Sequence, residues 1–247
     1  MARMAAFRTL WAALIGVYEE TLVLLAGNVA ALALNLPIGI LLLALGLVIA
    51  PGGEAPTVEW LLALIAWLIV FLPTPGNVAL AGLTQVAAGP DVPRFAEFRA
   101  ALGRHWRLAA RCSLVSVVVL GVLVWNVSFY ARFWPEWPSF ITIVWLEAVL
   151  IWLGLHIYLV PLLLHVTEPR LLDVYRRAAL ITLGHAFYTV VLLVLLLVVA
   201  FAAVVFLPVY VLVAPAFLSL AQAHALREVR RRHGDLPTDQ EEEMSRL

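Results

Sequence analysis

Residues 186–206 read AFYTVVLLVLLLVVAFAAVVF and contain no charged side chain. They lie within the longest apolar block of the chain, residues 178–226. A bilayer core takes about 20 helical residues, whereas a single helix over this block would extend roughly 70 Å. The stretch therefore predicts a membrane-embedded helix, and the block around it is too long for one crossing.

The composition of the whole chain leads to the same class of protein. Of the 247 residues, 64% are hydrophobic and 13% are charged, and the mean hydropathy is +1.00. A soluble domain carries about 25% charged residues, which it needs to cover its surface. These values exclude a soluble enzyme and a disordered chain, and they predict an integral membrane protein.

The distribution of arginine divides the apolar blocks into spans. The earlier blocks lie at residues 21–50, 58–88, 108–131 and 140–166, and all sixteen basic residues are arginines. The connections at 89–111 and 167–177 and the segment after 226 are rich in arginine, whereas the connection at 51–59 has none. Because arginine marks the cytoplasmic side, the last block must cross twice, and we expect a turn at Leu207-Pro208.

The prediction is an all-α polytopic transmembrane bundle of six spans, with both termini cytoplasmic and the first two spans broken by proline. The spans are expected at 18–50, 58–88, 107–131, 140–166, 178–207 and 209–227. They form one domain, 1–232, in the inner (plasma) membrane, followed by an acidic cytoplasmic tail, 233–247. Residues 1–17 form an interfacial helix or extend the first span. Five spans with a long final helix remain the alternative.

Two proline interruptions mark the middle of the first and second spans. The second span contains Pro73, Thr74, Pro75, Gly76 and Asn77 in succession, and the first contains Pro37 followed by Gly39. Prolines free backbone carbonyls, which are tolerated at membrane depth only inside protein or beside a wet cavity. Paired interruptions are typical of a transporter site, although two ordinary proline kinks would produce the same pattern.

Polar residues within the spans are the remaining candidates for an interior site. Asn28 and Asn35 share one helix face. They form a polar stripe with Asn77, Thr84, Gln85 and Asn126. The stripe could line a solute path or hold helices together by hydrogen bonds.

Three ionisable residues complete this set: Glu147, His156 and His185. Glu147 is an intramembrane acid, a residue type with a functional role by default, although its shallow depth lets it reach outer water. Two histidines on facing helices could ligate a haem, yet packing by hydrogen bonds is the commoner role and no haem motif surrounds them. We therefore expect no cofactor and no bound metal.

No catalytic motif occurs in the chain, so we expect no enzymatic activity. The arginine-rich segment 94–111 contains Phe95, Phe98 and Trp106, and it is interpreted as an amphipathic cytoplasmic helix that faces anionic lipid headgroups. The arginines follow from the membrane topology, so a nucleic-acid partner is not expected.

The order of several short motifs resembles the YesL-like family of small bacterial membrane proteins, a domain of unknown function. The first motif is either Asn28 with Leu36-Pro37 or Trp67 with Leu72-Pro73. The others are the run PGNVALAGL at 75–83, the aromatic and basic segment 95–107, Asn126 with Phe129-Tyr130, and HIYLVPL at 156–162. The resemblance covers residues 21–230. It departs from the family pattern in the 35 or so residues that separate Pro37 from Pro73.

The resemblance implies no established activity. It does imply an association with carbohydrate uptake, so the first functional expectation is a non-enzymatic accessory or regulator of solute transport, with the bilayer and a transporter component as partners. A small-solute transporter or channel is the second expectation. A structural or cofactor-bearing subunit of a larger membrane complex is the third.

Overall fold

The computed structural model describes residues 2–49, 69, 71–133, 138–165, 170–206 and 212–232. Within these residues the chain is all-helical, and its helices are α1 (Ala2–Glu19), α2 (Thr21–Ile49), α4 (Pro75–Ala87), α5 (Phe95–Phe133), α6 (Pro138–Leu163), α7 (Leu171–Gly184), α8 (Ala186–Val205) and α10 (Ala214–Arg232). The predicted turn at Leu207-Pro208, the acidic tail, and residues 58–68 and 70 of the second predicted span lie outside the described residues.

Three helices are long and apolar enough to cross a membrane, namely Thr21–Leu42, Phe95–Tyr130 and Phe140–Leu163. A fourth candidate is the pair α7 and α8, which is bent by 99° at His185. The membrane class of the protein is thereby supported, whereas six spans are not confirmed. The single helix predicted at 178–207 is wrong, because the chain bends where His185 follows Gly184.

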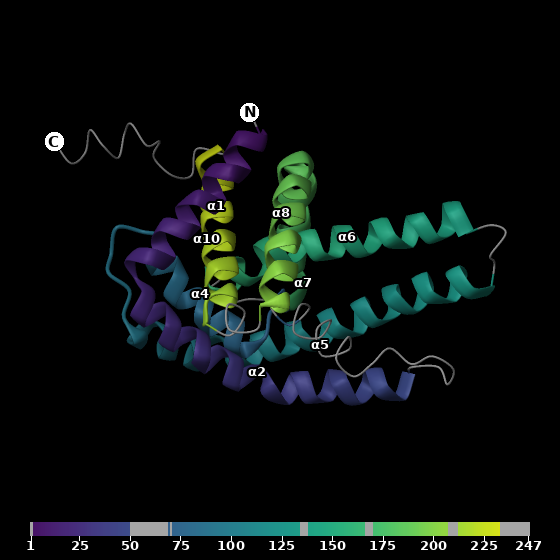
Figure 1. Ribbon diagram of the computed structural model, residues 1–247, viewed down its shortest axis with the longest axis horizontal. Coiled ribbons are helices and arrows are strands. Elements are labelled where there is room, and N and C mark those ends of the chain that lie inside the picture. Colours follow the sequence, from purple (N-terminus) through teal and green to yellow (C-terminus); the bar gives the residue numbers. More distant parts are fainter. Residues whose placement is uncertain are drawn as a thin grey trace.

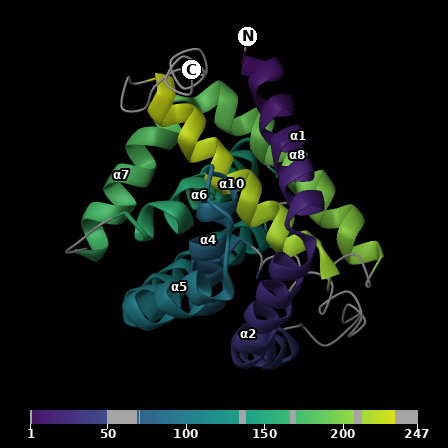
Figure 2. The same ribbon diagram turned by 90° about the vertical axis from the view of Figure 1, so that its left-hand side faces the viewer.

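The three long helices α2, α5 and α6 run in a similar direction, and α1, α8 and α10 cross them steeply (Figure 1). Turned by 90°, the molecule shows α2 and α5 end on, below α10 and α4 (Figure 2). Large apolar side chains face outward from the long helices and from α8, among them Leu36, Leu114, Ile151 and Phe201. Such a surface fits lipid rather than water.

The short helix α4 lies at the centre of the packing. It contacts α2, α5, α6 and α10, and its Val78, Ala79, Leu80 and Leu83 side chains are fully buried. A Cβ atom on Gly82 would overlap the side chain of Ala101 on α5, so a glycine is needed for this close approach. Helix α4 is therefore surrounded by protein rather than lipid.

Two helices differ from the predicted boundaries in an informative way. The expected break at Pro37 is not found, because α2 continues through this residue. The arginine-rich segment and the third span form one continuous helix, α5, which begins at Phe95 rather than near residue 107. The Arg94 backbone N–H donates to Glu97 Oε2 at 3.0 Å and satisfies an N-terminal donor of this helix.

The last helix, α10, is not among the candidate spans. It contains Gln222, His224 and four arginines, and it packs against α1, α4 and α6. The sixth span was predicted to begin at residue 209, which lies outside the described residues.

Candidate functional site

The proline-rich break before α4 is an ordered helix start. Thr74 is the N-cap, and the Asn77 backbone N–H donates to Thr74 Oγ1 at 3.1 Å. Pro75 occupies the first helical position, where a missing N–H costs nothing. The interruption predicted at Pro73–Asn77 is therefore confirmed, and the local sequence explains it.

The Asn77 side chain partners the carbonyl groups that this break releases. Its Nδ2 atom donates to the carbonyl oxygens of Ile69 at 2.7 Å and Leu72 at 2.8 Å. Ser113 Oγ on α5 donates to the Pro73 carbonyl oxygen at 2.9 Å. All three carbonyls thus bond to protein, which is what a buried backbone requires in the absence of water.

The same side chain also joins α4 to α2. Asn35 Nδ2 donates to Asn77 Oδ1 at 3.0 Å, and both side chains are buried. A Cβ atom on Gly76 would lie 2.6 Å from the Ala31 carbonyl oxygen and 2.6 Å from Asn35 Oδ1. Only glycine fits between these atoms, so Gly76 permits the contact that Asn35 and Asn77 hold.

The predicted polar stripe is present in part. Asn28 and Asn35 are both buried on α2, as their spacing predicts. Pro37, in contrast, lies on the exposed surface of α2. Asn126 does not join the stripe: it is half-exposed on α5, and its Nδ2 atom donates to the Val122 carbonyl oxygen at 2.8 Å on its own helix.

The structure places Glu147 on the exposed surface of α6 and His185 at the bend between α7 and α8. His185 is the C-cap of α7, and its backbone N–H donates to the Ile181 carbonyl oxygen. Neither residue contributes to the Asn35–Asn77 contact. Within the described residues no group of three histidine, cysteine or carboxylate side chains could hold a metal ion.

His156 belongs to a second buried cluster, which joins α5, α6 and α7. Its Nε2 atom lies 2.8 Å from Ser116 Oγ, and its Nδ1 atom lies 2.6 Å from the Trp152 carbonyl oxygen. Ser116 Oγ lies 2.9 Å from the Tyr175 hydroxyl, which donates to the Cys112 carbonyl oxygen at 2.9 Å. Both ring nitrogens of His156 therefore have protein partners, which disfavours a role as a haem ligand.

Sequence reasoning missed Ser116 and Tyr175 in this cluster. A weak signal existed, because Ala109, Cys112, Ser113 and Ser116 place small residues on one face of α5 between bulky apolar ones. The ring of Trp152 stacks on Tyr175 at 5.6 Å and meets His156 edge-on at 5.3 Å. The histidine is thus enclosed by side chains from three helices.

Other buried polar side chains pair across helices in the same way. Thr84 Oγ1 and Ser219 Oγ are 2.8 Å apart, as are Thr9 Oγ1 and the Tyr188 hydroxyl. The Tyr158 hydroxyl lies 2.9 Å from Thr189 Oγ1. These contacts hold helices together across the interior of the bundle.

Comparison with protein-family models, with curated proteins and with solved structures finds no match for this chain. The resemblance to the YesL-like family stays a prediction.

Proposed function

We propose that this chain is a non-enzymatic integral membrane protein that assists or regulates solute transport without conducting the solute itself. It lies in the inner (plasma) membrane with both termini cytoplasmic, and six crossings are the topology that the arginine distribution supports. The resemblance to the YesL-like family makes carbohydrate uptake the transport process to test first.

The observation that carries this proposal is the use of Asn77. A side chain that lines a solute path must offer donors and acceptors to the solute, as transporter breaks do. Asn77 instead donates to two carbonyl groups of its own chain and accepts from Asn35. The proline break at Asn77 is the feature of the sequence that most strongly predicted a solute path. Because Asn77 makes its hydrogen bonds within the protein, an accessory role in transport is favoured over a solute path.

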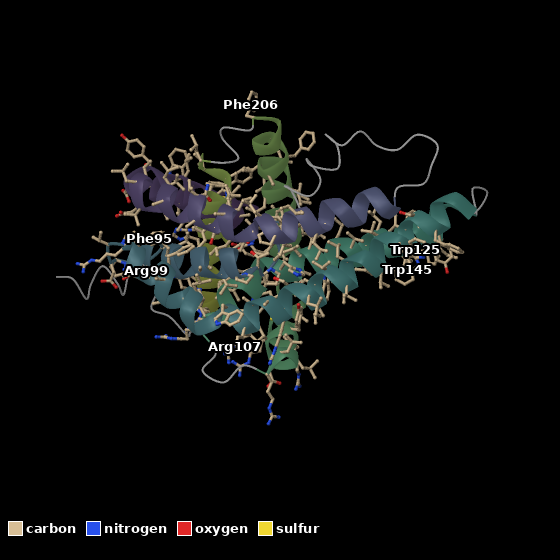
Figure 3. All side chains as sticks on the ribbon, turned by 90° about the horizontal axis from the view of Figure 1, so that it is seen from below. Phe95, Arg99, Arg107, Trp125, Trp145 and Phe206 are labelled. Carbon is tan, nitrogen blue, oxygen red and sulfur yellow. The ribbon has the colours of Figure 1, made fainter. Side chains whose placement is uncertain are left out.

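The first half of α5 supplies a surface for a partner. Arg99, Arg104, Arg107 and Arg111 are exposed there, whereas Phe98, Ala101 and Ala109 on the opposite face are buried. In Figure 3 the Arg99 and Phe95 side chains lie at one end of the long helices and Trp125 and Trp145 at the other. This separation fits a cytoplasmic basic end and an outer aromatic belt, and the basic end suits an acidic partner surface.

Co-purification from native membranes tests the proposal. The wild-type protein, extracted in a mild detergent, is expected to bring down a component of a solute transporter. A variant with Arg99, Arg104 and Arg107 replaced by glutamine is expected to lose that component. A matched variant with Arg3 and Arg8 replaced tests whether any loss of positive charge has this effect.

Flux measurements separate the accessory role from a transporter. Purified protein in vesicles is expected to pass labelled oligosaccharides no faster than protein-free vesicles do. Flux that depends on the protein and disappears in an Asn77→Ala variant would favour the transporter. Absence of any transport component among the co-purified proteins would contradict the accessory role.

A further inference from the structure

A basic pocket lies where the C-terminal ends of α4 and α6 meet α10. Its volume is about 130 Å³, room for roughly four water molecules at about 30 Å³ each. The lining residues are Gln85, His165, Ala223, Leu226, Arg227 and Arg230. The pocket is thus small, and the polar side chains among its described lining residues include two arginines and no carboxylate.

The hydrogen bonds at the pocket fix three of these side chains. Gln85 Nε2 donates to the Pro161 carbonyl oxygen at 2.9 Å, and His165 Nδ1 lies 3.0 Å from the same oxygen. Arg227 Nη1 donates to the Ala88 carbonyl oxygen, just after the end of α4. The walls are therefore held in place without any ligand, which limits the ordering cost of binding.

Capping of helix ends does not account for Arg230. Cations often satisfy the last carbonyls of a helix, and Arg227 has this role at α4. At α6 the Pro161 carbonyl already accepts from Gln85 and has His165 beside it. Among the described contacts, these two carbonyls have partners without Arg230, whose guanidinium group lines the pocket.

The electrostatic balance of the pocket is positive. The ends of α4 and α6 contribute roughly half a negative charge each, whereas Arg227 and Arg230 contribute one full positive charge each. Burial, together with the charges of Arg227 and Arg231, lowers the pKa of nearby His224 from 6.5 to about 4. The pKa of His224 thus reflects burial of its imidazole and also the positive charge on this part of α10, which a bound anion would neutralise.

We propose that this pocket binds a phosphate group, held by the guanidinium groups of Arg227 and Arg230 and by the imidazole of His165. Planar guanidinium groups match phosphate oxygens in a bidentate manner, and the pocket has room for a phosphate group. His165 Nδ1 donates to the Pro161 carbonyl oxygen, so Nε2 of the neutral ring is an acceptor and can take a hydrogen bond from a P–OH group of the phosphate. The phosphate can belong to an anionic lipid headgroup or to a soluble phosphate ester, since both present the same oxygens.

The experiment uses the full chain in detergent micelles and two probes. The first probe is inorganic phosphate, compared with chloride at equal ionic strength. The second is phosphatidic acid added to the micelles, compared with phosphatidylcholine. Binding of each probe is measured by the rise in unfolding temperature over a concentration series, which gives an apparent Kd.

The expected result is stabilisation by at least one phosphate probe and a weakening of about tenfold or more in an Arg230→Gln variant, because a charge-assisted hydrogen bond is lost. A His165→Gln variant should also weaken binding, and it provides a second test if the first variant folds poorly. An Arg99→Gln variant, which removes an exposed arginine of α5, is the matched control and should bind as the wild type does.

The two probes identify the source of the phosphate. Stabilisation by phosphatidic acid alone assigns the pocket to a lipid headgroup, and stabilisation by inorganic phosphate assigns it to a soluble ligand. The proposal is overturned if neither probe stabilises the protein, or if Arg99→Gln weakens binding as much as Arg230→Gln does. None of these outcomes depends on a role in transport.

Discussion

Replacement of Asn77 by alanine would break the joint between α2, α4 and the preceding loop. The variant loses three hydrogen bonds and leaves the Ile69 and Leu72 carbonyls and the Asn35 amide without this partner. The loss per bond lies between about 0.6 kcal/mol, the average value inside membrane proteins, and about 1 kcal/mol, the cost of leaving one buried group unsatisfied. We therefore expect a loss of about 2–3 kcal/mol.

Thermal unfolding in detergent measures this loss. For a domain of this size 1 kcal/mol corresponds to about 2–4 °C, so the Asn77→Ala variant should unfold about 4–12 °C below the wild type. Asn35→Ala removes only one of the three bonds and should give a smaller decrease. The readout is the temperature at which half of the protein no longer elutes as a single species.

Asn126→Ala is the matched control. This asparagine is half-exposed and bonds only to Val122 of its own helix among the contacts described above, and alanine is the better helix former by about 0.5 kcal/mol. The two effects nearly cancel, so the unfolding temperature should change by about 1 °C or less. An Asn77→Ala variant that unfolds at the wild-type temperature would contradict the stabilising role of the Asn77 hydrogen bonds. Equal destabilisation of Asn126→Ala would contradict it as well.

Three further predictions concern other parts of the bundle. Gly76→Ala should lower the unfolding temperature because the new methyl group meets the Ala31 carbonyl oxygen. Gly103→Ala, in open space on α5, should instead raise the free energy of unfolding by about 0.5–1 kcal/mol and with it the unfolding temperature. Ser116→Ala removes the hydroxyl between His156 and Tyr175, so tryptophan fluorescence and unfolding temperature should both change, and an unchanged protein would contradict the cluster. Burial and nearby arginines lower the pKa of His224 to about 4, so unfolding binds a proton below about pH 6.5. Stability should fall as the pH decreases from about 6.5 to 4, and a His224→Gln variant should lose the part of that dependence that His224 contributes.

The sequence predicted the features that depend on local chemistry. The prolines predicted an interruption at Pro73–Asn77, and the structure has a helix that starts there, at Pro75 after the N-cap Thr74. The burial of Asn28 and Asn35 follows from their spacing on one helix face. These results need only the geometry of a single helix.

Features that depend on packing between helices were beyond the sequence. Asn126 and Asn77 both lie within predicted spans, yet only Asn77 faces other helices, because α4 is central and the second half of α5 is exposed. In the His156 cluster, Ser116 lies 40 residues before the histidine and Tyr175, which bonds to Ser116, lies about 20 after it, and no periodicity links them. The bend at His185 involves neither proline nor a charged residue, which is why an unbroken span was predicted there.

The hydrogen bonds of Thr74, Asn77 and Ser113 close the break before α4 to water and hold the helices together. The most direct test is reaction of a Thr74→Cys variant, in a Cys112→Ser background, with a membrane-impermeant thiol reagent added from either side. Thr74 is fully buried, so we expect no reaction while an exposed Gly103→Cys variant is labelled. Rapid labelling of Thr74→Cys in the folded protein would show that water reaches the break, and it would contradict this account.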